Sequence, residues 1–224
     1  MSLAIDSNLI SARRPVKRGE PTWEMAIFYP LQGHWTEEEY LALDTNRLVE
    51  LVDGCLEVQP MPAPWHQRIA KFLFLLLNSF VEARRLGEVF FAPLPVWLWP
   101  KQLREPDVLF VRPHRIKDPK RPPKGADLAM EVVSEGEENR ERDLFIKRAE
   151  YAKAKIPEYW IVDVEMQRIT VLTLDGTEYR VHGEFGPGTR ATSGLLPGFS
   201  VAVSEVLAAG EARPQKTTKR RRRR

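Results

Sequence analysis

The stretch Asp127-Leu-Ala-Met-Glu131-Val-Val-Ser134 decides the fold class, because it is a nearly continuous apolar run with one acid in its middle. Such a run without polar alternation is typical of a strand that is buried on both faces of a sheet. An ionised carboxylate is costly to bury unless a cation or hydrogen-bond donors lie beside it. The stretch therefore predicts a central strand on which Glu131 meets either a metal ion or a salt-bridge partner.

Strands are predicted before this stretch, at 88–99 and 105–111, with a short turn at Pro100 and Lys101 between them. Asp107 follows Pro106 within the second of these strands, where an acid also commonly caps or ends a turn. The basic, proline-rich segment 112–125 is predicted to be a surface loop that could touch a phosphate backbone.

A helix is predicted over 141–155, after the acidic strand, and Pro157 ends it. Asp143, Lys147 and Tyr151 are spaced four residues apart, so they lie on one face of this helix. Asp143 and Lys147 also form an ordinary pair of the kind found on solvated helices. A strand over 159–163 follows, and Asp163 is expected to end it.

Hairpins are predicted at both ends of the domain, where Asp53-Gly54 and Asp175-Gly176 separate β-rich runs. A capping box at Thr36 starts a short helix that reaches to about residue 44. A longer helix runs from His66 to about residue 87, and a closing segment ends near residue 207. This order of elements predicts an α+β or α/β sheet with one helix on each side or both on one side.

The composition fits one globular domain, since 43% of the 224 residues are hydrophobic and 29% are charged. We expect an arm at 1–29, a domain at 30–207 and a basic tail at 208–224. Seven positive charges lie in residues 216–224, so residues 1–215 carry a net charge of −4. The arginine run 220–224 suits either nucleic acid phosphates or a solvated end.

The lone cysteine, Cys55, excludes an intrachain disulfide and gives little support to a cysteine-rich zinc cluster. We find no apolar run of the length that a signal peptide or a membrane span requires. A soluble, cytoplasmic protein with no membrane contact is therefore expected. Trp97, Trp99 and Trp160 are expected to pack in the core or on the sheet.

Asp107, Glu131 and Lys147 form the strongest candidate for chemistry. Hydrolysis of a phosphodiester needs a cation that neutralises charge on the phosphoryl oxygens and lowers the pKa of a bound water, and hard cations prefer carboxylate oxygens. Two acids on neighbouring strands suit such a cation. A lysine directed at the same place can orient the attacking water or stabilise the transition state.

Pro106-Asp107 followed by Glu131-Val-Val resembles the PD-(D/E)xK motif of restriction-endonuclease-like nucleases. Val133 stands where the motif has its lysine, so the amine must come from elsewhere. Further fragments, in the same order over roughly 36–207, are similar to the Uma-type endonuclease family. They are Glu50-Leu-Val-Asp53-Gly54, His66, Pro106-Asp107-Val, 127–134, Asp143 with Lys147 and Tyr151, Glu158-Tyr-Trp-Ile-Val-Asp163, and Leu196-Pro-Gly198.

The resemblance implies a mixed β-sheet core of restriction-endonuclease type, flanked by helices and carrying added β-hairpins. It implies that Asp107, Glu131 and the backbone carbonyl of Val132 bind Mg²⁺ or Mn²⁺. Lys147 would replace the missing lysine. The same resemblance gives roles as catalytic groups near the cation to Glu50 and His66, and supporting roles to Asp143 and Tyr151. Taken alone, a histidine at a helix start such as His66 is more often a cap or surface residue than a ligand, and Glu50 could simply point to solvent.

Three functions are open at this point. The first is a cation-dependent endonuclease that cuts nucleic acid, with DNA as the substrate that the resemblance implies, and with a homodimer expected by analogy. The second is an inactive module that keeps the nuclease fold and binds nucleic acid or a protein, which the missing lysine at Val133 motivates. The third is a structural partner in a larger assembly, which the long N-terminal arm motivates.

Overall fold

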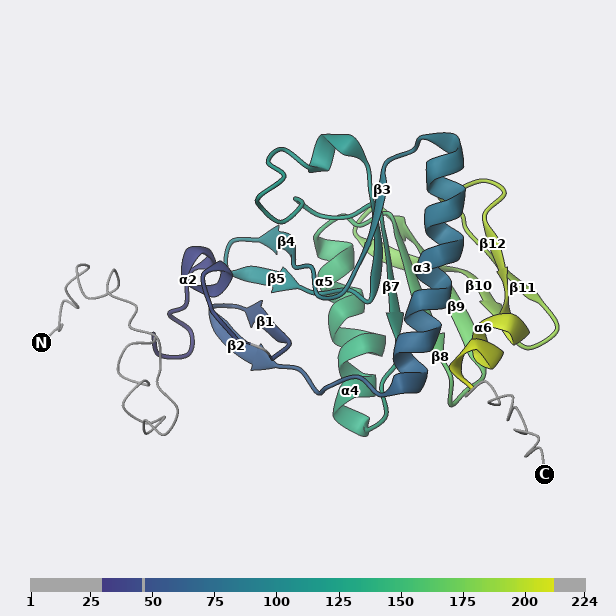
Figure 1. Cartoon of the computed structure of the whole chain (residues 1–224), viewed down its shortest axis with the longest axis horizontal. Helices are drawn as coiled ribbons and strands as arrows, with labels where there is room; N and C mark the ends of the chain where they lie inside the picture. Colours follow the sequence, from purple (N-terminus) through teal and green to yellow (C-terminus); the bar gives the residue numbers. More distant parts are fainter. Residues whose placement is uncertain (1–29, 46, 212–224) are drawn as a thin grey trace, which may run out of the picture.

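The computed structural model describes residues 30–45 and 47–211, so the expected arm at 1–29 and the arginine run lie outside the described residues (Figure 1). The strands are β1 (Val49–Val52), β2 (Cys55–Val58), β3 (Glu88–Phe91), β4 (Val96–Trp99), β5 (Gln102–Arg104), β6 (Val108–Val111), β7 (Leu128–Val132), β8 (Glu158–Asp163), β9 (Arg168–Asp175), β10 (Glu178–Phe185), β11 (Arg190–Thr192) and β12 (Ser200–Ala202). The helices are α2 (Glu37–Leu41), α3 (Pro64–Arg84), η3 (Pro113–Arg115), α4 (Glu137–Glu141), the π-helical η4 (Arg142–Ile146), α5 (Lys147–Lys153) and α6 (Val203–Gly210).

A six-stranded mixed sheet in the order β10-β9-β8-β7-β6-β3 forms the body of the molecule. Strand β7 lies inside it, antiparallel to β6 and parallel to β8. All five β7 residues are buried, which agrees with the continuous apolar run around Glu131. The stretch that predicted a central strand therefore forms one.

Helices cover both faces of this sheet, as Figure 1 shows with α3 and α5 on its two sides. One core cluster joins α3 and α6 to the sheet, through residues such as Leu73 and Trp160. The other joins α5 to the opposite face, through Tyr151 and Tyr159. Of the two arrangements that the sequence left open, the structure has one helix on each side.

A second sheet of four strands, in the order β2-β1-β5-β4, stands beside the first. The hairpin β1-β2 turns at Asp53-Gly54, as predicted, and β5 pairs with its other edge. Helix α2 begins at the predicted capping box, where the Thr36 hydroxyl accepts from the Glu39 amide. This sheet is the added hairpin that the sequence suggested, extended by two strands, and it completes the mixed α and β architecture.

The prediction of one strand over 88–99 is wrong. Residues 88–91 form β3 in the large sheet, and residues 96–99 form β4 in the small one. Pro93 and Pro95 lie between them and lack the N–H that a continuous ladder needs. Likewise the predicted strand over 105–111 begins only at Val108, because β5 ends at Arg104 and Glu105-Pro106-Asp107 connects the two sheets.

Other predicted elements are present with shifted ends. Helix α3 runs from Pro64 to Arg84, and the helical segment after β7 starts at Glu137 rather than near 141. The hairpin at Asp175-Gly176 joins β9 to β10. Helix α6 continues to Gly210, three residues beyond the predicted end of the closing segment.

The basic loop at 112–125 follows β6, whereas Asp107 precedes that strand. The loop therefore lies at the end of the sheet away from Asp107. Asp127 holds it there, because its carboxylate accepts from the guanidinium of Arg115 at 3.0 Å and from the backbone N–H of Arg112 at 2.8 Å. The contact of this loop with a phosphate backbone stays a prediction.

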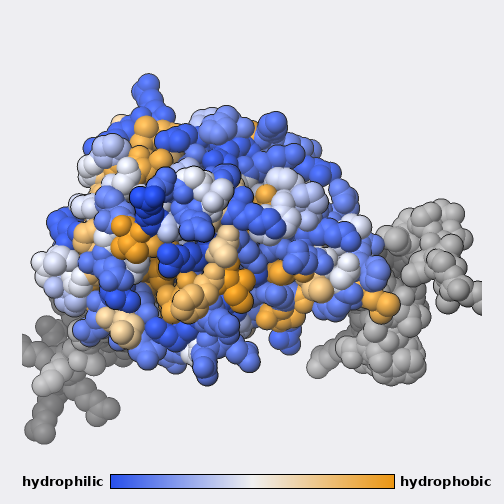
Figure 2. Space-filling view, turned by 180° about the vertical axis from the view of Figure 1, so that it is seen from behind, coloured by the Kyte–Doolittle hydropathy of each residue, from blue (hydrophilic) through white to orange (hydrophobic). Residues whose placement is uncertain are grey.

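The face of the molecule that is turned away in Figure 1 is mostly hydrophilic. Hydrophobic side chains gather in a band across the lower half of this face (Figure 2). None of the helices in the described part of the chain has the length and apolar character to cross a membrane. Trp160 is fully buried, and Trp97 and Trp99 are half-buried against the core clusters, so the prediction that the tryptophans pack is confirmed.

Glu158 fastens the C-terminal part to the large sheet. Its carboxylate is fully buried and accepts from the Trp160 indole, the Ser193 hydroxyl and the backbone N–H groups of Gly194 and Leu195, at 2.6 to 2.7 Å. Four donors satisfy one buried carboxylate, as burial requires. The carboxylate of Glu158 thus joins its strand to the segment just before Leu196.

Replacing this carboxylate tests its structural role. We expect Glu158→Ala to lower the free energy of unfolding by about 3 kcal/mol, because two buried donors, on Trp160 and Ser193, and two backbone N–H groups lose their acceptor. Urea unfolding followed by tryptophan fluorescence measures the change. Glu178→Ala, at an exposed position on β10, is the control and is expected to change stability by less than about 0.5 kcal/mol. Equal stability of the two variants would contradict this role.

Candidate active site

Asp107 and Glu131 come from neighbouring antiparallel strands. Val108 on β6 pairs with Met130 on β7, so Asp107, one residue before β6, faces Glu131 across the ladder. The backbone N–H of Val132 donates to Oδ2 of Asp107 at 2.8 Å and fixes that carboxylate at the strand end. Both acids line one pocket.

Glu131 is buried, with 3% of its surface exposed, and two donors reach the same oxygen. Nζ of Lys147 donates to Oε1 at 3.0 Å, and the hydroxyl of Tyr151 donates to it at 2.6 Å. Burial raises the pKa of Glu131, and the nearby carboxylates of Asp107 and Asp143 raise it further, against the attraction of Lys147. Burial and the neighbouring acids thus disfavour the charged form of Glu131, and a cation bound beside it would favour that form.

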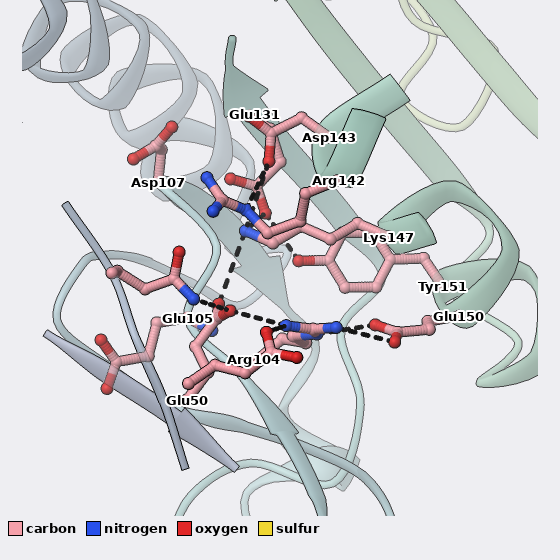
Figure 3. Close-up of polar contacts among 12 residues, drawn as sticks. Glu50, Arg104, Glu105, Asp107, Glu131, Arg142, Asp143, Lys147, Glu150 and Tyr151 are labelled. Carbon is pink, nitrogen blue, oxygen red and sulfur yellow. Dashed lines mark hydrogen bonds and ion pairs between the residues drawn. The ribbon is translucent and has the colours of Figure 1, made fainter. Parts of the chain in front are cut away.

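Lys147 is equally buried and is surrounded by acids. Its Nζ lies 3.0 Å from Glu131, 3.5 Å from Oε1 of Glu50 and 3.8 Å from Oδ1 of Asp143. Burial disfavours its charged form, but the attraction of these three carboxylates outweighs burial and raises the pKa of Lys147. Lys147 is therefore a fixed ammonium at neutral pH. Figure 3 shows it between the Glu131 and Asp143 carboxylates above and Glu50 below.

A π-helical turn, η4, precedes Lys147 in the helix that covers this face of the sheet. The backbone N–H of Lys147 bonds to the carbonyl of Arg142, five residues back. Tyr159 on β8 donates its hydroxyl to the carbonyl of Asp143 at 2.7 Å within the same turn. Such single turns occur frequently at functional sites. Here the turn presents Asp143 and Lys147 to the same pocket.

A buried ion cluster centred on Arg104 lies beneath Lys147, and no sequence pattern indicated it. Arg104 is 1% exposed and donates to Glu50, Glu57 and Glu150 at 2.7 to 2.8 Å. Glu50 also accepts from the amide of Gln59 at 2.9 Å and from the backbone N–H of Glu105 at 2.8 Å. Figure 3 shows Glu50 shared between Arg104 and Lys147. An arginine alternating with leucine on a short strand looks like a solvent-facing residue.

Glu50 therefore does not point to solvent. Burial favours its neutral form, but Lys147 and Arg104 together lower the pKa of Glu50. Its carboxylate is an anion that links the small sheet to Lys147. Its position next to Lys147 suits a role in orienting that amine.

His66 lies on the other side of the pocket, near the start of α3. Its Nε2 is 2.8 Å from the carbonyl oxygen of Val132 and 3.2 Å from Oδ2 of Asp107. Burial disfavours the imidazolium, but Asp107 and the Val132 carbonyl outweigh burial and raise the pKa of His66. Nδ1 is buried and has no hydrogen-bond partner among the described residues. His66 thus contacts two of the three groups that the resemblance assigns to a cation.

A metal ion bound in this pocket would have few protein ligands. No group of three or more His, Cys, Asp or Glu side chains in the described ranges is arranged as a metal cluster. Mg²⁺ is commonly held by one or two carboxylates and keeps several waters. The carboxylates of Asp107 and Glu131 with the carbonyl of Val132 fit such a partly hydrated ion, and a cation there would favour the charged form of Glu131 that burial disfavours.

Arg142 is a further pocket residue that the sequence did not single out. Its Nε lies 3.4 Å from Oδ1 of Asp143, and its side chain is 17% exposed. In Figure 3 its guanidinium reaches toward the space between Asp107 and Lys147. A guanidinium suits a phosphate oxygen by its fork of donors. Its position in the π-helical turn becomes apparent only from the fold.

Comparisons with known proteins agree with this architecture. Residues 37–204 match the family model Uma2, which is described as "Putative restriction endonuclease". A crystal structure described as "a putative nuclease belonging to DUF820" from Anabaena variabilis is similar, with a TM-score of 0.64 and 18% identity. The match covers 81% of this chain and 100% of that one, and it shows a shared fold. No curated protein matches the chain.

The Arg104 cluster allows a test of what supports the pocket. We expect Arg104→Met to lower the free energy of unfolding by about 3 to 5 kcal/mol at pH 8, because Glu50 and Glu150 lose a buried counter-ion. The loss should shrink toward pH 5.5. Without Arg104 the pKa of Glu50 rises, so Glu50 takes up a proton in the folded variant as the pH falls.

Urea unfolding at both pH values measures these losses. Arg121→Met is the control, because the Nη1 atom of Arg121 lies 4.0 Å from Glu38 on the surface. It is expected to have almost no effect. A loss for Arg104→Met that is the same at both pH values would contradict the protonation of Glu50.

Proposed function

Because this chain belongs to the Uma2 family, described as "Putative restriction endonuclease", we propose that it is a metal-dependent endonuclease that hydrolyses phosphodiester bonds in DNA. One observation carries the proposal. Nζ of Lys147 lies 3.0 Å from Glu131, on the face of β7 where Asp107 is the neighbouring acid. An amine from helix α5 thus stands in for the lysine that Val133 replaces in the strand.

Asp107, Glu131 and the carbonyl of Val132 would hold Mg²⁺ or Mn²⁺ in this proposal. A cation bound there supplies neutralisation of the phosphate charge and a water of lowered pKa. A restriction endonuclease, as the family is described, ordinarily requires a divalent cation and a nucleic acid substrate. The donor set and the buried acidic groups around it support this part of the proposal.

The chain's own residues have distinct tasks in the proposal. Lys147 orients the attacking water and stabilises the charge that develops on the phosphoryl oxygens. Glu50 and Asp143 keep Lys147 protonated and in place, and Tyr151 fixes the rotamer of Glu131. His66 holds a proton between Asp107 and the Val132 carbonyl, at a position from which it can pass the proton to a leaving oxygen.

The proposal extends to the organisation of the protein. We place the nuclease domain at 30–207, preceded by an arm and followed by a basic tail. A homodimer would present two such sites to the two strands of a duplex. The single cysteine suits a reducing, cytoplasmic compartment.

Cleavage assays test the activity. We expect the purified full chain to nick supercoiled plasmid or cut single-stranded DNA in Mg²⁺ or Mn²⁺, and to be inactive in EDTA. Glu131→Gln and Lys147→Met should each reduce the cleavage rate at least about 100-fold, because the first removes a cation ligand and the second removes the amine that stabilises the developing charge.

Glu135→Gln is the matched control, because Glu135 is an exposed acid four residues after Glu131. It should cleave like the wild type. Circular dichroism melting separates loss of activity from loss of folding, and Tyr151→Phe provides a milder variant that removes only a hydroxyl. DNA binding without cleavage by the wild type would favour an inactive binding module, and unchanged cleavage by both site variants would exclude this site.

Metal binding gives an independent test. We expect Mn²⁺ to bind the full chain in isothermal titration calorimetry without DNA, and Asp107→Asn to weaken binding at least about tenfold, because one of two carboxylate ligands is lost. Asp118→Asn, in the loop beyond β6, should leave the affinity unchanged. Equal Mn²⁺ affinity of wild type and Asp107→Asn would rule out Asp107 as a ligand.

A further inference from the structure

An apolar groove lies beside the candidate active site, between helix α3 and the end of strand β3. Figure 1 shows these two elements side by side. The groove encloses about 450 Å³, within the range of small-molecule sites. One stripe of α3 at helical spacing forms its long wall, and β3 and the residues after it form the other. The α3 wall carries Arg68, Lys71, Phe74 and Leu75, and the other wall carries Phe91 and Asp107.

The groove is continuous with the candidate active site. Gln67, Ala92 and Asp107 line both the groove and the pocket that contains Glu131 and Lys147. A strand whose phosphate lies at Asp107 and Glu131 therefore has its neighbouring nucleotide at the mouth of the groove.

The floor of the groove presents an unused aromatic surface. Phe91 is 57% exposed, and Phe74 packs on it edge to face with ring centroids 4.8 Å apart. Leu75 on the same wall is 53% exposed. Contiguous apolar side chains left in water commonly mark a binding site. A planar base stacks well on such a ring, and this contact does not depend on base identity.

The rim of the groove is positively charged and polar. Arg68 and Lys71 are exposed one helical turn apart on the same face of α3. Gln67 adds an amide at the end of the groove toward the active site. Cations beside an aromatic floor suit the phosphates that flank a stacked base. An interface between copies of the chain tends instead to be depleted in lysine. Charge complementarity and continuity with the active site thus both favour nucleic acid.

We propose that this groove binds one unpaired nucleobase of the substrate strand, stacked on Phe91, next to the phosphate at Asp107. This inference deepens the endonuclease proposal and rests on it for the position of the phosphate. Bases in an intact duplex are stacked on their neighbours and cannot enter the groove. The substrate class is therefore single-stranded nucleic acid, or a strand with an unpaired base at an end, flap or mismatch.

Binding measured without cleavage tests the groove. Fluorescence anisotropy in EDTA compares a labelled 12-nucleotide single strand with its 12-base-pair duplex on the full chain. We expect tighter binding of the single strand. Phe91→Ala should weaken single-strand binding about tenfold, the size of effect expected when one base loses its stacking partner, and leave duplex binding unchanged.

An abasic site moved along the single strand gives a sharper readout. Wild type should lose affinity most at one position, and Phe91→Ala should show no extra loss there. Val181→Ala is the matched control, because Val181 is 54% exposed on β10, the opposite edge of the same sheet. It should behave as wild type. Lys71→Gln should weaken binding of both single strand and duplex and lower the salt dependence.

Equal binding of the single strand by wild type and Phe91→Ala would overturn the proposal. So would a loss that is uniform across single strand, duplex and every abasic position. If Phe91→Ala instead converted a dimer to a monomer in sizing with single-strand binding unchanged, the groove would be a contact between copies. Because these readouts need no cation and no cleavage, an inactive protein that shows the Phe91 effect would separate failure of the endonuclease from failure of the groove.

Discussion

The contact between the Glu131 carboxylate and the Lys147 ammonium is the interaction on which the site depends. Glu131 lies in the middle of an apolar strand and is almost fully buried, so its charge must be met from within the protein. Lys147 meets it at 3.0 Å, and the Tyr151 hydroxyl meets it at 2.6 Å. Both donors come from α5, so the packing of that helix on the sheet positions the two groups that favour the charged form of Glu131 against burial.

This contact is one link in a chain of alternating charges that crosses between the two sheets. Arg104 on β5 is paired with Glu50 on β1, Glu50 lies 3.5 Å from Lys147, and Lys147 contacts Glu131 on β7. Each member is almost fully buried. A shift of the small sheet against the large one would therefore leave a buried charge without its partner, which is far more costly than losing a surface ion pair. The small sheet is in this way part of the site's support.

Sequence patterns predicted the secondary structure correctly where the interactions that determine it are local. Asp53-Gly54 and Asp175-Gly176 made hairpins because turn geometry is set by adjacent residues. The apolar run around Glu131 formed a central strand, because a continuous apolar run without polar alternation suits burial on both faces of a sheet. The prediction of one strand over 88–99 was wrong, because a pattern rich in aromatic residues does not reveal that its two halves join different sheets. The π-helical turn before Lys147 also carried no local signal, since its residues fit an ordinary helix equally well.

The sequence by itself determined the order of the elements and the presence of an acid that an apolar strand cannot bury alone, because both follow from spacing along the chain. It also placed Asp143, Lys147 and Tyr151 on one helix face. Only the tertiary structure decided which cations reach the buried acids, that Arg104 underlies Glu50, and that the groove at Phe91 opens beside Asp107. The physical reason is that these contacts join residues far apart in sequence, and their geometry is set by how helices and sheets pack, which no periodicity in the chain encodes.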